Sequence, residues 1–406
     1  MFGIEIKLAF LNLVRERKRA VIALAAIVVG VAGYLLAGGF IGWIFWAIRE
    51  STIDNGLGHI QVSAQGFRSA GRTDSGRFVI PVDSPQRDAI AHIPGVRVVG
   101  ARLTVSGLAS HGDTTVPFAA EGVEPGLDRR IATDLVVDGD PLDPAAATGV
   151  VLGLGLARAL NVTRGDKVTF ITATASGGMS GVEGVVRGLF STGVKAYDDL
   201  AVRMPLPMAQ QLARVKGAQL WVIRLADTSL TDEAVKDVRQ IVAGSGMEVR
   251  TWYELSDFYR KTVTLMSRQM AVVAVLIAVI LVLGIANVLM MSTLERTREI
   301  GTMLAMGTSR RSVLRMHLAE GVLLGGAGAV LGVTAGILLA AAISWVGIPM
   351  PPPPGRNVGY DARIMLELPV IVNAILLAFA SAAVAGVYPA WKASRMPIVD
   401  ALRANA

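Results

Sequence analysis

The chain has 406 residues, of which 52% are hydrophobic, and a mean hydropathy of +0.53. This composition is too apolar for an ordinary soluble protein and predicts a membrane protein with more than one domain. The net charge of +7 does not indicate a nucleic-acid partner, because the basic excess lies in three short segments that flank apolar stretches. The chain has no cysteine, which excludes disulfides, thiol catalysis and Cys-ligated metals.

The N-terminal part predicts an amphipathic elbow followed by a first membrane span. Ile4, Leu8 and Leu11 share one helical face within residues 1–19, and a basic cluster follows them. Residues 20–48 are then continuously apolar, which is far longer than the core of a signal peptide. We therefore expect a retained span whose basic flank lies on the cytoplasmic side.

Residues 49–269 have the composition of a water-soluble α+β domain, with charges and frequent glycine and proline. Residues 49–125 and residues 220–252 each predict the order strand, helix, strand, and the two halves could share one sheet. Between them, residues 126–219 are rich in β-type segments and suggest an inserted subdomain. Residues 253–269 predict a helical stalk that leads to the second span.

A charged island at residues 292–317 separates two further apolar runs, 270–291 and 318–346, each long enough to cross a bilayer. Its arginines outnumber its acids, so we place it in the cytoplasm. The spacing of its apolar residues predicts a short amphipathic helix, which Gly307 would end. Two interpretations remain open: the helix rests on lipid headgroups, or it docks a cytoplasmic partner.

The third span has small residues four apart, which lets one helix face approach another closely. These glycines could pack inside the bundle or form a subunit interface, and both alternatives remain open. They are Gly321, Gly325, Gly328, Gly332 and Gly336. A proline-rich outer loop at 347–365, a fourth span at 366–390 and a cytoplasmic tail at 391–406 complete the prediction. The expected architecture is a four-span helical bundle, with both termini inside and a large domain outside between spans 1 and 2.

Patterns typical of enzymes are missing from the sequence. No phosphate-binding loop of the type G-x-x-x-x-G-K-[ST] occurs, so we do not expect this chain to hydrolyse ATP. The histidines lack the spacing of metal ligands, and we expect no metal site. Glu320 and His317 lie near the start of the third span, where we favour contact with interfacial water over burial among helices. We read the segment SGGMSG as a flexible hairpin tip.

Two motifs together identify a family resemblance. The segment ERTREIGTMLAMGTSRRSVL before a glycine-rich span, and the terminal YPAWKASRMPIVDAL, resemble the FtsX-like permeases of type VII, or MacB-like, ABC transporters. The segments GHIQVSAQGF, AAEGVEP, VVLGLGLARAL, RGDKVTF and VRTWYEL are similar to the lipoprotein-releasing, LolC/LolE-type branch. The resemblance covers nearly the whole chain.

The resemblance implies a non-catalytic permease of the bacterial inner membrane that pairs with a second copy or a paralogue. It also implies a cytoplasmic ATPase dimer, which binds ATP and Mg²⁺, whereas this chain holds no cofactor. Nucleotide-driven closure would pass through the membrane to a periplasmic domain with Porter-like parts, 49–125 and 220–252, and a Sabre-like part, 126–219. The resemblance does not imply a nucleic-acid partner. It implies membrane lipid around the four spans.

In the family, a coupling helix that matches Thr293 to Gly307 sits in a groove of the ATPase. Its charged residues would make polar contacts, its apolar residues would fill the groove or face the membrane surface, and its glycines would permit tight geometry. The candidate coupling residues are Glu295, Arg296, Thr297, Arg298, Glu299, Ile300, Gly301, Met303, Leu304 and Gly307. A hairpin tip of the Sabre-like part recruits a periplasmic carrier in relatives, and the matching residues are Ser176, Gly177, Gly178, Met179, Ser180 and Gly181.

The resemblance is compatible with three functions. The leading one is extraction of lipoproteins or related lipids from the outer leaflet of the inner membrane. The second is MacB-like export of peptides, antibiotics or other envelope compounds through a periplasmic adaptor. The third is FtsX-like regulation of a cell-wall hydrolase, which the size of the domain at 49–269 disfavours.

Overall fold

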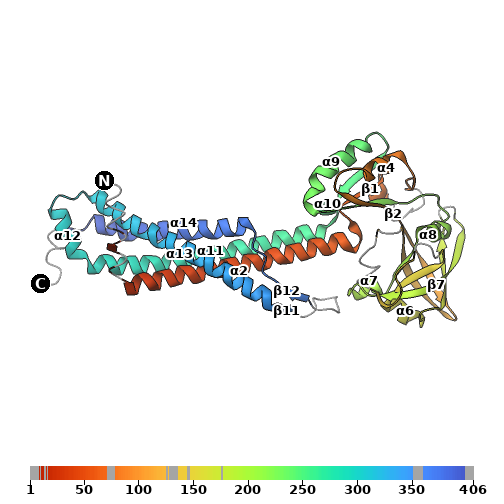
Figure 1. Cartoon of the computed structure of the whole chain (residues 1–406), viewed down its shortest axis with the longest axis horizontal. Coiled ribbons are helices and arrows are strands. Elements are labelled where there is room, and N and C mark those ends of the chain that lie inside the picture. The colour runs from red at the N-terminus through yellow and green to blue at the C-terminus, as the bar shows by residue number, and fades with distance from the viewer. Residues whose placement is uncertain are drawn as a thin grey trace. The chain divides into compact units, whose positions relative to one another are not determined.

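The computed structural model describes residues 9, 11–12, 15, 17–70, 78–124, 127, 136–143, 147–174, 177–350 and 360–397. Most of the expected elbow, the loop residues 351–359, the tail residues 398–406 and Ser176 lie outside these ranges. The chain divides into two compact units (Figure 1). The helical unit comprises residues 1–46, 261–349 and 361–406, and the domain unit comprises residues 47–260 and 350–360.

Among the described residues, four helices are long and apolar enough to cross a membrane. They are α2 (Arg17–Thr52), α11 (Asp257–Glu295), α13 (Arg310–Val346) and α14 (Leu368–Ser394). The short helix α12 (Thr297–Ala305) joins α11 to α13 at one end of the bundle (Figure 1). Together with the domain unit, these helices confirm the predicted fold class.

The helices are longer than the apolar runs that predicted them. The expected stalk, from residue 257 onward, belongs to α11 itself, and α14 continues past Pro389 to Ser394. Hydropathy marks only the part of a helix that suits lipid, whereas backbone hydrogen bonding continues into polar segments. The charged island at 292–317 therefore contains the end of α11, all of α12 and the first turns of α13.

The glycine face of α13 packs against α2 and α14 of the same chain. A Cβ on Gly328 would lie 2.5 Å from Ile27 Cγ2 in α2, and a Cβ on Gly325 would lie 2.4 Å from Ala382 Cβ in α14. Gly332 and Gly336 meet α2, and Gly321 meets α14, in the same way. Only glycine allows these close approaches, so the structure places the glycine face inside the bundle.

The domain unit is built on one large sheet in which most neighbouring strands are antiparallel. Its strand order is β10-β1-β9-β2-β3-β8-β5-β7-β4, with β6 paired to β2 and β7. The strands are β1 (Ile60–Ala64), β2 (Val96–His111), β3 (Thr114–Val123), β4 (Val136–Gly139), β5 (Gly149–Gly153), β6 (Lys167–Ala173), β7 (Met179–Phe190), β8 (Ala201–Pro205), β9 (Leu220–Leu225) and β10 (Met247–Thr251).

The two predicted strand–helix–strand halves do share this sheet. The unit β1–α4–β2 contributes the helix α4 (Pro85–Ala91), and β9–α9–β10 contributes α9 (Thr231–Ile241). The start of α4 follows from its sequence, because Ser84 accepts a hydrogen bond from the backbone N–H of Arg87 and proline follows the cap. The strand β1 lies between β10 and β9, so the halves interdigitate.

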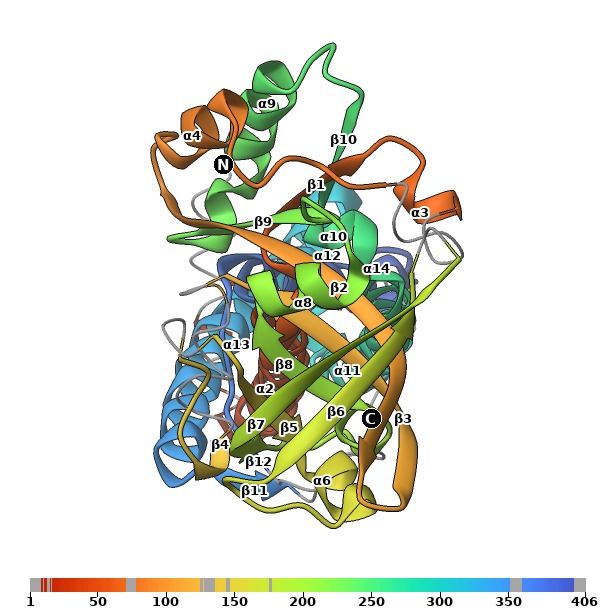
Figure 2. The ribbon, with the colours of Figure 1, turned by 90° about the vertical axis from the view of Figure 1, so that its right-hand side faces the viewer.

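The expected inserted subdomain is continuous with the rest of the sheet. The strands β2 and β3 are 16 and 10 residues long, and they extend from the interdigitated halves into the insert (Figure 2). One end of β2 pairs with β9, and the other end pairs with β6. One buried apolar cluster spans both parts, from Ile60 to Phe170 to Val238. The sequence alone suggested that a subdomain begins at residue 126, but the strands β2 and β3, which precede that residue, extend into the subdomain.

Short elements complete the structure. In the domain unit these are the π-helix η1 (Ile53–Leu57), α3 (Phe67–Ala70), α6 (Leu154–Leu160), α7 (Lys195–Asp198), α8 (Leu206–Ala213), the 3-10 helix η2 (Thr228–Leu230) and α10 (Trp252–Leu255). A two-stranded sheet joins β11 (Ile348–Met350) to β12 (Tyr360–Ala362).

Candidate functional site

The helix α12 and the turn after it form the predicted coupling segment. The helix ends before Gly307, whose φ of +93° lies in the left-handed region that favours glycine. The N–H of Gly307 donates to the carbonyl of Leu304 at 3.1 Å. Ser309 then caps α13 by accepting a hydrogen bond from the N–H of Ser312 at 3.2 Å. The predicted helix and its glycine turn are therefore present, and α13 begins directly after them.

The inward face of α12 is part of the core of the helical unit. Ile300 is 1% exposed and Leu304 is 8% exposed, and both pack with Val313 of α13 and Ala393 of α14. Met303 packs against the same cluster, and Gly301 is buried. The family motif predicts that Ile300, Met303 and Leu304 fill a partner's groove or face the membrane surface. In the structure these side chains hold α12 onto the ends of α13 and α14.

The outward face of α12 has a different composition. Arg298, Thr302 and Ala305 are exposed, as is Met306 directly after the helix. The Met306 side chain is 75% exposed, which is unusual for a large apolar residue beside a buried cluster. Two exposed arginines, Arg310 and Arg311, begin α13 on the far side of the turn. We call Arg298, Thr302, Met306, Arg310 and Arg311 the outward surface of the segment.

The acidic residues of the segment bind arginines of the same chain. Glu299 accepts a hydrogen bond from Arg15 at 3.0 Å, and Arg296 lies 3.6 Å from its other carboxylate oxygen. Glu295 forms a two-pronged ion pair with Arg19 at the start of α2. The predicted contact residues Glu295, Arg296 and Glu299 thus already have internal partners.

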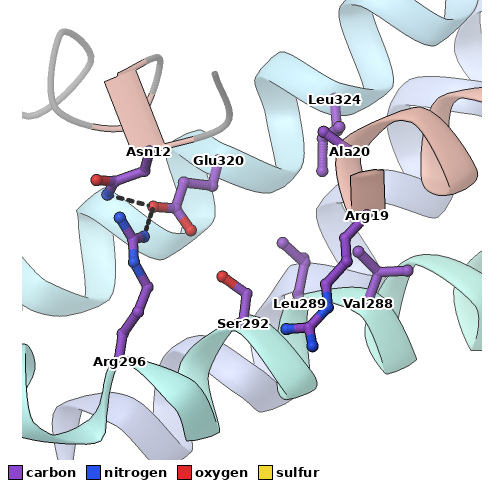
Figure 3. Close-up of a pocket in the computed structure, with 9 residues that line it drawn as sticks. All are labelled: Asn12, Arg19, Ala20, Val288, Leu289, Ser292, Arg296, Glu320 and Leu324. Atoms are coloured by element: carbon purple, nitrogen blue, oxygen red, sulfur yellow. Dashed lines mark hydrogen bonds and ion pairs between the residues drawn. The ribbon is translucent and has the colours of Figure 1, made fainter. Parts of the chain in front are cut away.

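The most deeply buried charges of this region meet at Glu320 on α13. Glu320 is 2% exposed, and Arg296, at the corner between α11 and α12, is 9% exposed. The carboxylate accepts a hydrogen bond from Arg296 Nη1 at 3.3 Å and another from Asn12 Nδ2 at 2.7 Å (Figure 3). A small pocket beside this carboxylate lies between α2, α11 and α13, and Arg19 and Ser292 are among its lining residues.

The predicted interfacial setting of Glu320 and His317 is wrong. His317 is 4% exposed, and its Nδ1 lies 3.0 Å from the carbonyl oxygen of Val313. Glu320 tolerates burial because a cation and an amide satisfy its carboxylate. These partners stand 24 and 308 residues away in the sequence, so no local pattern could have found them.

The described residues at the hairpin between β6 and β7 are Thr174 and Gly177 onward. Gly177 has a φ of +83° and donates its N–H to the carbonyl of Thr174 at 2.9 Å. The N–H of Gly178 donates to the hydroxyl of Thr174, so only Met179, 72% exposed, presents a large apolar side chain there. Ser180 points inward and is 8% exposed, while Gly181 follows it in β7. Ser176, the first residue of the predicted tip, lies outside the described residues.

Ionisable residues in the described part of the chain do not gather into a metal site. Within the ranges given above, no group of three or more His, Asp or Glu side chains is arranged to hold an ion. The features that remain are four membrane helices, a large mixed α/β domain between the first and second, and a polar helix between the second and third. They define a multi-span membrane protein that carries a large α/β domain between its first two membrane helices.

Family models match both parts of the chain. Residues 20–241 match the MacB-like periplasmic core domain, and residues 271–398 match the FtsX-like permease C-terminal family. Because the first match covers more than half of the chain, the chain belongs to the family of FtsX-like permeases that carry a MacB-like periplasmic core domain.

Two relatives align with most of this chain. The macrolide export ATP-binding/permease protein MacB of Rhodospirillum rubrum is 27% identical over all of this chain and 61% of its own length. The lipoprotein-releasing system transmembrane protein LolC of Xylella fastidiosa is 25% identical over 85% of this chain and 84% of its own length. Among solved structures, the periplasmic region of MacB from Actinobacillus actinomycetemcomitans covers 51% of this chain and 95% of its own, with 12% identity and a TM-score of 0.38.

The chain is shorter than the MacB proteins it matches. It spans 61% of the Rhodospirillum rubrum protein and 27% of the MacB of Syntrophobacter fumaroxidans.

Proposed function

We propose that this chain is the membrane subunit of an ABC transporter whose ATP is hydrolysed in a separate partner. The family match supports this, and so does the lack of a phosphate-binding loop in the sequence. The observation that carries the proposal is the outward surface of α12 and its turn. A short helix whose inner face is locked into the bundle, and whose outer face is exposed, can transmit a push from a bound partner to the membrane helices.

The outward surface defines the expected contacts. The acids Glu295 and Glu299 are neutralised by Arg19 and Arg15, so the surface left for a partner is basic and carries Met306 as an apolar anchor. Charge complementarity then requires an acidic groove with an apolar pocket on the ATP-binding subunit. Arg298 keeps its predicted role as a partner contact.

We place α12 and both termini in the cytoplasm and the domain unit in the periplasm of a bacterial cell. The basic residues around α12 and at the start of α2 support this orientation, because short basic segments stay on the cytoplasmic side. A second copy or a paralogue completes the membrane part. The exposed Met179 at the hairpin tip is the proposed contact for a periplasmic carrier or adaptor.

We favour lipoprotein release as the activity. The LolC relative is named as a transmembrane protein, and this chain spans 84% of its length, so the two have similar extent. Export of macrolides or other envelope compounds is the second candidate, because the MacB relative aligns with the whole of this chain.

The experiment that separates these functions uses the full chain, reconstituted with its ATP-binding partner in proteoliposomes. We expect ATP to release an acylated reporter lipoprotein into the soluble fraction, without accumulation of a labelled macrolide. Macrolide transport without lipoprotein release would favour the second candidate, and neither activity, despite ATP hydrolysis by the complex, would contradict both.

The outward surface is tested in the same preparation. Exposed ion pairs contribute only about 0–1 kcal/mol each, so the informative variant is the double change Arg298→Glu/Met306→Asp. It should weaken association with the ATP-binding subunit. Arg363→Glu changes another exposed arginine, located after β12 near the opposite end of α13, and should leave association unchanged.

A further inference from the structure

Three residues near the N-terminus reach three different helices. Asn12 binds Glu320 of α13, Arg15 binds Glu299 of α12, and Arg19 binds Glu295 of α11. Their spacing of three and four residues in the sequence is the spacing of one face of a helix. Each acceptor is a carboxylate near the junction of α11, α12 and α13 (Figure 3 shows the Glu320 contact).

The three contacts differ in strength. The side chains of Arg15 and Glu299 are 71% and 48% exposed, so solvent screens this pair and it contributes little. The Arg19–Glu295 pair is also half-exposed. The third contact, from Asn12 to Glu320, reaches a carboxylate whose side chain is only 3% exposed. Glu320 also holds Arg296, whose side chain is 10% exposed, so removing Glu320 leaves a buried charge without compensation. Glu320 is therefore the shared point at which Asn12 and the corner between α11 and α12 attach to α13.

We infer that Asn12, Arg15 and Arg19 together act as a strap that joins α11, α12 and α13 to the first membrane helix, with Glu320 as its positioning residue. The chain itself connects α12 only to α11 and α13. Arg19 belongs to α2, which is continuous from Arg17 to Thr52, so the strap adds a second connection, from the α12 corner directly into α2. A displacement of α12 then moves the ends of α2 and α11 together. This inference goes beyond the proposed function, because it concerns the rigidity of this chain alone.

The lack of cysteine makes the strap directly measurable. Leu11 is 52% exposed beside Asn12, and Met306 is 75% exposed after α12, so Leu11→Cys/Met306→Cys gives two accessible and unique positions for spin labels. The distance distribution is measured by pulsed electron spin resonance on the full chain in lipid nanodiscs. We expect one narrow peak.

Two variants test the attachment. Glu320→Ala should broaden the peak about twofold, because Arg296 then loses its buried partner. Asn12→Ala removes only the 2.7 Å hydrogen bond of the N-terminal segment and should also broaden the peak. If Glu320→Ala does not fold, the peak width of Asn12→Ala alone tests the strap. Arg311→Gln alters an exposed arginine outside the strap and serves as the matched control, with no broadening expected.

The outcomes separate the strap from the proposed function. An unchanged distribution in Asn12→Ala and in any folded Glu320→Ala protein would overturn the strap, whether or not an ATP-binding subunit binds.

Discussion

His59 should make the stability of the domain unit depend on pH. The imidazole is 6% exposed at the start of β1, and its Nδ1 accepts a hydrogen bond from the N–H of Leu225 at 3.1 Å. Its Nε2 lies 3.2 Å from the hydroxyl of Thr228. Burial, together with the nearby Arg224 guanidinium, lowers the pKa of His59 to about 4. The folded domain therefore holds the neutral ring, whereas the unfolded chain takes up a proton near pH 6.5.

The sign and size of the effect follow from linkage. Because the folded pKa is the lower one, the contribution of His59 is complete above pH 6.5 and is lost as the pH falls toward about 4. Each pH unit in this window is equivalent to about 1.4 kcal/mol, so the free energy of unfolding should fall by about 2 kcal/mol between pH 7.5 and pH 5. For a unit of this size, that lowers Tm by about 4–8 °C.

The assay is thermal unfolding of the full chain in detergent, with hydrogen exchange of β1 and β9 peptides reporting on the domain unit. The titration of Glu121 does not obscure the pH dependence of stability between pH 7.5 and pH 5. Burial alone would raise its pKa, but Arg203 and Arg102 outweigh burial and lower it below 4.5, so its contribution is lost only at more acidic pH. His59→Gln should abolish most of the pH dependence between 7.5 and 5, and His92→Gln, an exposed control, should preserve it. Equal pH dependence in His59→Gln and in the unsubstituted protein would refute this reasoning.

Two further predictions concern packing and buried charge. Gly328→Ala should lower the free energy of unfolding by about 1–3 kcal/mol, because the new methyl group meets Ile27. Adding Ile27→Ala should partly restore the thermal stability of Gly328→Ala. A Gly328→Ala protein as stable as the original would contradict the tight packing of α13 on α2. Glu121→Gln should destabilise the domain unit by about 3–5 kcal/mol, because Arg203 and Arg102 would remain buried without their shared carboxylate, and a change below about 1 kcal/mol in denaturant unfolding would contradict this.

Local sequence patterns predicted the elements that depend on near neighbours. Long apolar runs located the four membrane helices, and Gly307 was recognisable as the turn that ends α12. These features depend on residues within one or two turns, so a single sequence contains the necessary information.

Contacts between distant segments were not predictable in this way. An acid near the start of a membrane helix has the same local sequence whether it faces headgroups or accepts a buried arginine. Only the fold brings Asn12 and Arg296 to Glu320. The amphipathic pattern of α12 likewise could not show whether Ile300 and Leu304 face a partner or the chain's own α13 and α14. Hydrophobic periodicity identifies the buried face of a helix but not what buries it.

The central claim is that the outward surface of α12 receives an ATP-binding subunit. The most direct measurement is site-specific cross-linking from Met306→Cys, which is the only thiol in the substituted chain. We predict that a short cross-linker joins position 306 to the ATP-binding subunit, and that a cysteine at Val372, an exposed position within membrane helix α14, gives no such product. The reverse pattern, with the product at position 372 and none at 306, would contradict the account.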